Sequence, residues 1–167
     1  MRKKPEISLR GRALQYLARR EYSRAELRTK LLPYLIVEDD FAQAPSIDLD
    51  ALLDDLTARG WLSDARATTQ LVHAKRKRFG MQRITHELRQ RGISDDLIDA
   101  ELPALKESEL EAARDVWQRK FGTLPQDAKE KAKQMRFLQS RGFSIDTILK
   151  VLKLSSAMEE GDEDAIG

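Results

Sequence analysis

Residues 63–102 carry the start and stop signals of three short α-helices, and this pattern constrains the fold more than any other part of the chain. Ser63 can cap the first helix, and Phe79-Gly80 ends it at a residue that tolerates the left-handed conformation. The second helix stops at Arg91-Gly92, and the Ser94 hydroxyl can open a third. Apolar residues recur at three- to four-residue spacing within each helix. Three helices of this length cannot bury a core alone, so the unit must pack against its neighbours.

The flanking sequence repeats this pattern. Phe121-Gly122 lies 42 residues after Phe79-Gly80, and residues 141–146 (RGFSID) lie 50 residues after residues 91–96 (RGISDD). Upstream, Tyr22-Ser23 takes the place of Phe79-Gly80. Glycine stops shared by chance would explain one such match but not the ordered set. The sequence therefore predicts an all-α fold of tandem three-helix repeats, each burying its apolar face against the next.

The boundaries of the repeats follow from the same signals. We expect five segments: a flexible basic arm at 1–7, repeat 1 at 8–62 with an acidic loop at 37–46, repeat 2 at 63–103, repeat 3 at 104–154, and a disordered acidic tail at 155–167.

Three prolines bear on the helix ends. Pro33 is expected to kink or end the helix that begins at the capping box Ser23-Arg24-Ala25-Glu26, because proline removes an amide and clashes with the preceding turn. Pro103 is expected in the first turn of a long helix that ends near Lys120, and Pro125 is expected to open the following helix.

Composition excludes several classes of protein. The chain is 35% charged and 41% hydrophobic, and it has no cysteine, so it has neither disulfides nor thiolate chemistry. The first residues, MRKKPEISLRGR, have no apolar segment of the kind found in secretory signals, and no apolar run reaches membrane-spanning length. We expect a soluble, cytoplasmic protein.

Charge alternates in phase with the repeats. The formal net charge is +7 over residues 1–30, −7 over 31–58, +7 over 59–94, −6 over 95–115, +6 over 116–153 and −5 over 154–167. Regularly stacked repeats of this kind could present a positive stripe and a separate negative one. The alternative is that the charges solubilise the helices and pair with one another.

No catalytic or metal-binding motif is present in the sequence. His73 and His86 fall on different predicted helices without the spacing of a metal pair. The acidic pairs Asp54-Asp55 and Asp95-Asp96 lie near helix starts, where capping and the helix dipole explain them. No glycine-rich phosphate loop or nucleophile elbow occurs. We expect no enzymatic activity, no cofactor and no metal.

The basic residues are the better candidates for function. Lys75, Arg76, Lys77 and Arg78 are consecutive at the end of a predicted helix, where a helix dipole alone would favour one or two cations. Further cations follow in this repeat and hold comparable places in the first: Arg83, Arg89, Arg91, Arg24, Arg28 and Lys30. Such a set predicts salt-sensitive phosphate contacts without base readout. Trp61 and Trp117 are expected in the core, which leaves few aromatic rings for base stacking.

Four segments together resemble the RecX family of bacterial RecA regulators. They are YLARREYSRAELRTKL, LDDLTARGWLSD, FGMQRITHELRQRGIS and FLQSRGFSIDTILKVL, and the resemblance extends over residues 14–152. The chain departs from the family in having Met81 where members often have proline, and in a longer acidic insertion before Ser46.

This resemblance implies an elongated, curved molecule that lodges in the groove of the RecA–DNA filament or caps its end. Such a protein suppresses strand exchange, ATP hydrolysis and coprotease activity without chemistry of its own. The implied partners are the RecA filament and single- and double-stranded DNA. The protein is expected to be a monomer and to have no membrane partner. We expect the binding surface to comprise Arg24, Arg28, Lys30, Lys75, Arg76, Lys77, Arg78, Arg83, Arg89 and Arg91.

Two other interpretations remain open. The chain could be a stand-alone helical protein that binds DNA without sequence preference and without RecA, or a helical scaffold on which the cations are incidental. Only a RecA regulator would show affinity that rises sharply when a RecA filament replaces bare DNA.

Overall fold

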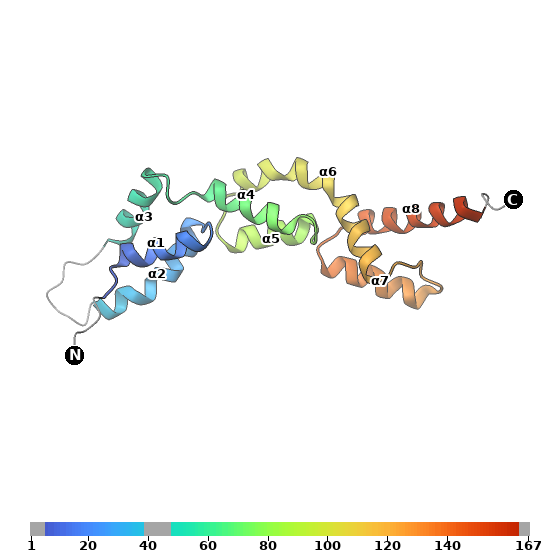
Figure 1. Cartoon of the computed structure of the whole chain (residues 1–167), viewed down its shortest axis with the longest axis horizontal. Coiled ribbons are helices and arrows are strands. Elements are labelled where there is room, and N and C mark those ends of the chain that lie inside the picture. The colour runs from blue at the N-terminus through green and yellow to red at the C-terminus, as the bar shows by residue number, and fades with distance from the viewer. Residues whose placement is uncertain (1–5, 39–47, 164–167) are drawn as a thin grey trace. The chain divides into compact units, whose positions relative to one another are not determined.

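A computed structural model describes residues 6–38 and 48–163, which form eight α-helices and no strand (Figure 1). The helices are α1 (Leu9–Arg19), α2 (Arg24–Glu38), α3 (Leu49–Ala58), α4 (Asp64–Lys75), α5 (Met81–Gln90), α6 (Asp95–Lys120), α7 (Ala128–Ser140) and α8 (Ile145–Glu163). The predicted all-α class is confirmed. The predicted basic arm falls mostly, and the acidic loop largely, outside the described residues, although Val37 and Glu38 belong to α2.

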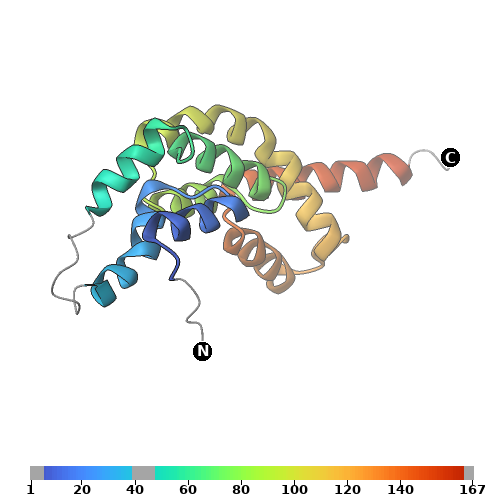
Figure 2. The same ribbon diagram turned by 60° about the vertical axis from the view of Figure 1, so that its left-hand side comes forward.

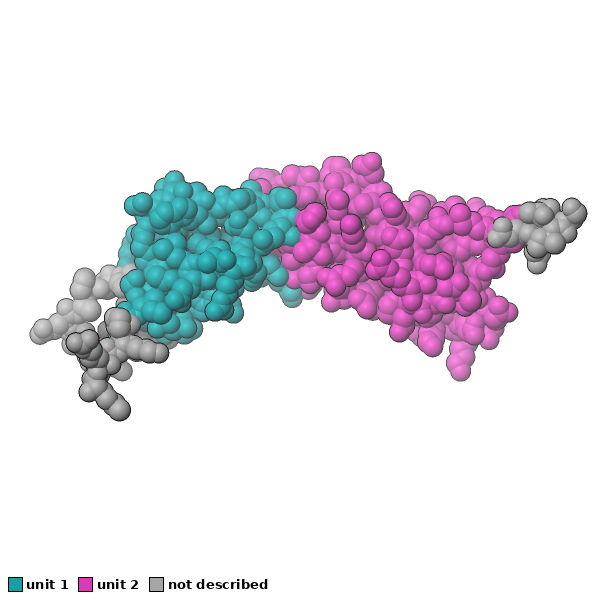
Figure 3. Space-filling model, in the orientation of Figure 1, with its two compact units in different colours: residues 1–70, 89–94 teal, residues 71–88, 95–167 magenta. Residues whose placement is uncertain are grey.

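The chain divides into two compact units, residues 1–70 with 89–94 and residues 71–88 with 95–167 (Figure 3). The division passes through α4 and α5, so neither helix belongs to one unit alone.

The first unit has a leucine-rich core. Helix α1 packs beside α2, and α2 packs on α3 (Figures 1 and 2). The buried side chains are Leu9, Ala13, Tyr22, Leu27, Leu31, Leu49, Leu53, Leu56 and Leu62. On each helix they recur at three- or four-residue spacing, so each helix buries one face.

The second unit has its main core where α6, α7 and α8 pack on one another (Figures 1 and 2). Its buried side chains are Ala112, Ala113, Trp117, Leu138, Phe143, Ile148, Val151 and Leu152. Trp117 is only 3% exposed, and its Nε1 donates a hydrogen bond of 2.8 Å to Oε1 of Gln134, which is also buried. The prediction that Trp117 belongs to the core is therefore confirmed.

Corresponding turns make corresponding contacts within the two units. In the second unit, the Gly80 amide donates to the Arg141 carbonyl at 2.8 Å, and the Gln82 amide donates to the Gly142 carbonyl at 3.3 Å. These bonds satisfy backbone amides at the start of α5, which have no partner within the helix. The Arg141-Gly142 turn therefore packs directly onto the N-terminus of α5.

The first unit uses the matching residues. The Ser23 hydroxyl donates to the Arg91 carbonyl, and a Cβ on Gly92 would lie 2.5 Å from the Cβ of Ala25. The Arg91-Gly92 turn thus packs onto the start of α2 as Arg141-Gly142 packs onto the start of α5. Because Tyr22-Ser23 and Phe79-Gly80 hold equivalent places in these contacts, the repeat alignment made from the sequence is supported by the contacts themselves.

A buried carboxylate joins three helices of the second unit. Glu109 of α6 accepts from the Met81 amide at 3.2 Å through Oε1 and from the Thr147 hydroxyl at 3.1 Å through Oε2. The Thr147 amide and hydroxyl in turn bond to the Ser144 hydroxyl. A carboxylate beside the first amide of α5 also interacts favourably with the helix dipole.

Replacing Glu109 with alanine should lower the free energy of unfolding by about 2 kcal/mol, because the Met81 amide and Thr147 hydroxyl would lose a charged partner. Glu109→Gln keeps an acceptor oxygen and should cost less. Urea denaturation followed by circular dichroism measures both variants. Equal stability of Glu109→Ala and the unmodified protein would show that these bonds contribute nothing.

Two prolines lie inside helices: Pro33 does not end α2, and Pro103 is not in the first turn of a new helix. Helix α6 is continuous through Pro103, so the two helices expected on either side of it are one. Ile98 and Leu105 are both buried and lie two turns apart on one face, so a continuous helix buries both. Pro103 in α6 and Pro33 in α2 are both exposed. Water can therefore reach the backbone carbonyl groups that each proline leaves without an amide donor.

Helix α7 begins at Ala128 rather than at Pro125. Asp127 accepts from the Glu130 amide at 2.8 Å, and the Glu130 carboxylate accepts from the Gln126 amide at 2.8 Å. These two acidic residues satisfy the first free amides and place the helix start after the proline.

Helix α8 continues to Glu163, whereas the sequence predicted disorder from residue 155. Ser155 occupies the next inward position after Val151, is buried, and donates its hydroxyl to the Val151 carbonyl at 2.9 Å. One turn further along α8, the Met158 sulfur accepts a hydrogen bond from the Arg114 guanidinium of α6. The sequence predicted disorder because this stretch has few apolar residues, but the buried Ser155 continues the inward face of α8.

Candidate nucleic-acid interface

The basic run at the end of α4 lies mainly in a turn. Helix α4 ends at Lys75, and Arg76, Lys77 and Arg78 follow it in a turn with all three side chains exposed. None of them forms an ion pair with another described residue. They are therefore available to an external anion.

The neighbouring cations are engaged within the second unit. Lys75 lies 3.6 Å from the Glu87 carboxylate. Around the Phe79 ring, Lys75 Nζ lies 5.1 Å, the Arg83 guanidinium 4.2 Å and the Arg141 guanidinium 5.4 Å from the centroid. Such contacts fix the position of the charges but do not neutralise them. Lys75, Arg83 and Arg141 thus surround one ring, and the Glu87 carboxylate pairs with Lys75.

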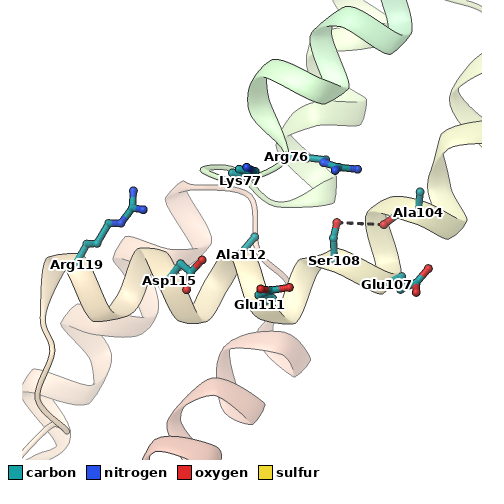
Figure 4. Close-up of a pocket in the computed structure, with 9 residues that line it drawn as sticks. All are labelled: Arg76, Lys77, Ala104, Glu107, Ser108, Glu111, Ala112, Asp115 and Arg119. Carbon is teal, nitrogen blue, oxygen red and sulfur yellow. Dashed lines mark hydrogen bonds between the residues drawn. The ribbon is translucent and has the colours of Figure 1, made fainter.

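A cleft of about 600 Å³ lies between the Arg76-Lys77 turn and α6 (Figure 4). Along α6, Glu107, Glu111 and Asp115 follow one another at four-residue spacing and line the cleft. The small side chains of Ala104 and Ala112 also line the cleft. The cleft thus has Arg76 and Lys77 on one side and, on the α6 side, a row of three carboxylates that ends in the cation of Arg119 (Figure 4).

In the first unit, two predicted cations face the acidic helix α3. Arg24 pairs with Asp54 at 2.8 Å, and Arg28 pairs with Asp50 at 3.3 Å. Part of the charge alternation is therefore internal pairing, which was the alternative interpretation. All four side chains are substantially exposed, so each pair contributes at most ~1 kcal/mol and can exchange for another anion.

The remaining predicted residues lie around a second cleft in the first unit. Lys30 of α2, Arg89 of α5 and Arg91 line a cleft of about 300 Å³ with Thr29 and Glu26. Arg91 lies 3.8 Å from the Glu26 carboxylate. The predicted cations are thus divided between the units: Arg24, Arg28, Lys30, Arg89 and Arg91 belong to the first, and Lys75, Arg76, Lys77, Arg78 and Arg83 belong to the second.

Glu26 completes the capping box predicted at the start of α2. The Glu26 amide donates to the Ser23 hydroxyl and the Ser23 amide donates to the Glu26 carboxylate, both at 3.1 Å. Burial by itself raises the pKa of Glu26, but hydrogen bonds from Arg20 and Ser23, with the attraction of Arg91, outweigh it and hold the pKa below its usual value. Glu26 therefore stays ionised and keeps Arg91 beside the cleft.

The sequence misplaced one aromatic residue. Trp61 was expected in the core, yet its side chain is 44% exposed. Among the exposed large hydrophobic side chains of the described residues, it is the one aromatic ring. The signal that could have placed it is its position directly after Gly60, outside the helical periodicity of α3.

No described helix combines the length and the hydropathy needed to cross a membrane. Within the described ranges, no three His, Cys, Asp or Glu side chains are grouped so that they could hold a metal ion.

Comparison with known proteins decides the family. Three family models match in chain order: the first three-helix domain of RecX at residues 10–40, the second at 63–102 and the third at 107–152. The chain belongs to the RecX family. The expectation of tandem three-helix domains is confirmed by these matches, and so is the resemblance noted in the sequence.

Curated members of the RecX family match nearly the whole chain. The regulatory protein RecX of Leptothrix cholodnii is 48% identical over 159 residues, covering 95% of this chain and 96% of the relative. The regulatory protein RecX of Ralstonia nicotianae is 41% identical, with 94% of both chains covered. The prediction of a regulator rather than an enzyme agrees with membership in this family.

Solved RecX structures share the fold. The crystal structure of RecX from Lactobacillus salivarius superimposes with a TM-score of 0.66, at 20% identity, and covers 87% of this chain and 95% of that one. A second crystal structure of a regulatory protein RecX gives a TM-score of 0.67 at 21% identity over 86% of this chain.

Proposed function

We propose that this protein is a negative regulator of the RecA recombinase that binds the RecA–DNA filament, in its groove or at its end. By occupying the filament it inhibits strand exchange, ATP hydrolysis and coprotease activity, and it acts as a monomer in the cytoplasm. Membership in the RecX family supports the assignment. The single observation that carries it is the exposed triplet Arg76–Arg78, which has no internal ion pair among the described residues.

The cleft beside this triplet suggests how one surface can meet a nucleoprotein polymer. Cations at the turn are suited to DNA phosphates, while the carboxylates of α6 are suited to lysine or arginine side chains of a protein. A polymer of DNA and protein offers both kinds of group side by side. Neither Arg76 nor Lys77 requires a particular base, so binding is indifferent to sequence.

Adding the protein to RecA on single-stranded DNA should lower the rate of ATP hydrolysis, and the inhibition should weaken as salt increases. The measurement is the steady-state ATPase rate at two salt concentrations, with the protein titrated at each. Binding to bare DNA is measured in parallel by fluorescence anisotropy. Unchanged ATPase at full occupancy of the DNA would contradict the proposal.

The exposed triplet also fits a stand-alone DNA-binding protein that acts without RecA. That candidate predicts equal affinity for bare DNA and for RecA-coated DNA at matched salt. A RecA regulator predicts a marked gain on the filament, because α6 then finds protein partners.

A further inference from the structure

We propose that Trp61, flanked by Arg10 and Arg59, forms a stacking site for an unpaired base, so that the first unit prefers single-stranded nucleic acid. This inference deepens the proposed function by naming the class of nucleic acid that this surface binds. It concerns residues that the charge pattern alone did not single out.

The turn after α3 directs the Trp61 ring outward. Gly60 adopts a φ of +75°, a left-handed conformation that ends the helix. The amides of Trp61 and Leu62 both donate to the Leu56 carbonyl, at 3.0 and 3.2 Å. Leu62 is 2% exposed and joins the core, while the adjacent Trp61 ring stays in solvent. The exposure is thus set by hydrogen-bonded backbone rather than by a loose loop.

Two guanidinium groups flank the ring. Arg10 of α1 lies 5.6 Å and Arg59 lies 5.4 Å from the ring centroid. Both are held by one carboxylate, because Arg10 and Arg59 donate to Oδ2 of Asp55 at 2.7 and 3.0 Å. The hydrogen bond from Arg10, which has the larger effect, and the one from Arg59 keep the pKa of Asp55 below its usual value. Asp55 therefore stays ionised and positions both cations beside the ring.

This combination matches the chemistry of a nucleotide. A base has an apolar face that stacks on an indole, and its phosphates carry negative charge that arginine attracts. Two cations against one carboxylate leave the patch net positive. In a duplex the base faces are already stacked and unavailable, so the ring distinguishes single strands from double strands.

A protein partner is the less favoured occupant. An indole that anchors a protein interface usually fills a well-packed, fully desolvated pocket of the partner. Here two guanidinium groups, those of Arg10 and Arg59, lie beside the ring. Their charge favours a polyanion over an apolar cavity.

Intrinsic fluorescence tests the site directly, because Trp117 is buried and Trp61 is exposed. Titrating oligothymidylate into the full-length protein should quench the emission, whereas a blunt hairpin duplex should quench it little. Trp61→Ala should abolish the quenching and weaken oligothymidylate binding, measured by anisotropy, by roughly 5- to 140-fold. Trp61→Phe should retain part of the affinity, and duplex affinity should be unchanged in both variants.

Leu14→Ala is the matched control, since it removes an apolar side chain of similar exposure (37%) from α1 of the same unit. It should leave oligothymidylate affinity unchanged. The inference is overturned if oligothymidylate does not bind, if it binds without quenching, or if Trp61→Ala binds it normally. It is also overturned if Trp61→Ala loses only RecA-filament affinity, which would assign the ring to a protein contact. Because none of the fluorescence titrations contains RecA, failure of this site and failure of RecA inhibition are separate results.

Discussion

Gly142→Ala should lower the free energy of unfolding by about 2–5 kcal/mol. Gly142 has a φ of +89°, and a left-handed conformation costs a residue with a Cβ roughly 1–2 kcal/mol. An added Cβ would also lie 2.3 Å from the Cβ and 2.6 Å from the backbone nitrogen of Arg83. Relieving such a clash costs a further ~1–3 kcal/mol, because backbone cannot rotate aside. Urea denaturation followed by circular dichroism gives the change.

Gly60→Ala is the matched control for backbone conformation. Gly60 has a similar φ of +75°, but a Cβ there would meet nothing within 4 Å. Its substitution should therefore cost only the conformational part, about 1–2 kcal/mol. Equal losses of unfolding free energy in the two variants would contradict this explanation. They would mean that backbone conformation alone, and not the close approach of the Arg141-Gly142 turn to α5, requires glycine at position 142.

The sequence predicted this turn because its determinants are local. An Arg-Gly pair after a helical stretch and a serine two residues later are recognisable one repeat at a time, and Arg91-Gly92 and Arg141-Gly142 both follow that rule. Repetition aligned Tyr22-Ser23 with Phe79-Gly80, and Ser23 and Gly80 donate equivalent hydrogen bonds, to the carbonyls of Arg91 and Arg141. These features depend on a few neighbouring residues and on the order of the repeats.

Features that depend on tertiary packing were not predicted. Pro103 reads locally as a helix start, but burial of Ile98 and Leu105 on one face keeps α6 continuous. The same limit applied to the candidate site. The exposure of Arg76–Arg78 depends on α4 ending at Lys75, and the exposure of Trp61 depends on the turn at Gly60. Residue types singled out these cations as candidates, but which of them form ion pairs within the protein depends on tertiary packing.

Reversing the charge of the exposed triplet, as Arg76→Glu, Lys77→Glu and Arg78→Glu together, should have the largest effect on binding. Three phosphate contacts would become repulsive, so affinity for DNA at low salt should fall on the order of 100-fold or more. The slope of log K against log salt should become shallower by about 3, since each lost phosphate contact removes about one. Inhibition of the RecA ATPase should weaken in parallel. Because the side chains are exposed and form no ion pair with other described residues, stability should change little.

The matched control makes the same change in net charge elsewhere in the second unit. Lys129, Lys131 and Lys133 are exposed on α7, and replacing all three with glutamate alters the charge by the same amount. If position determines binding, this variant should keep most of its affinity and inhibition when both variants are compared at physiological ionic strength, because exposed charges are largely screened there beyond ~8 Å. Equal losses in both variants would mean that net charge alone drives association. Full inhibition of RecA by a folded triplet variant would remove Arg76–Arg78 from the binding surface, and the candidate interface would then have to lie on the cations of the first unit.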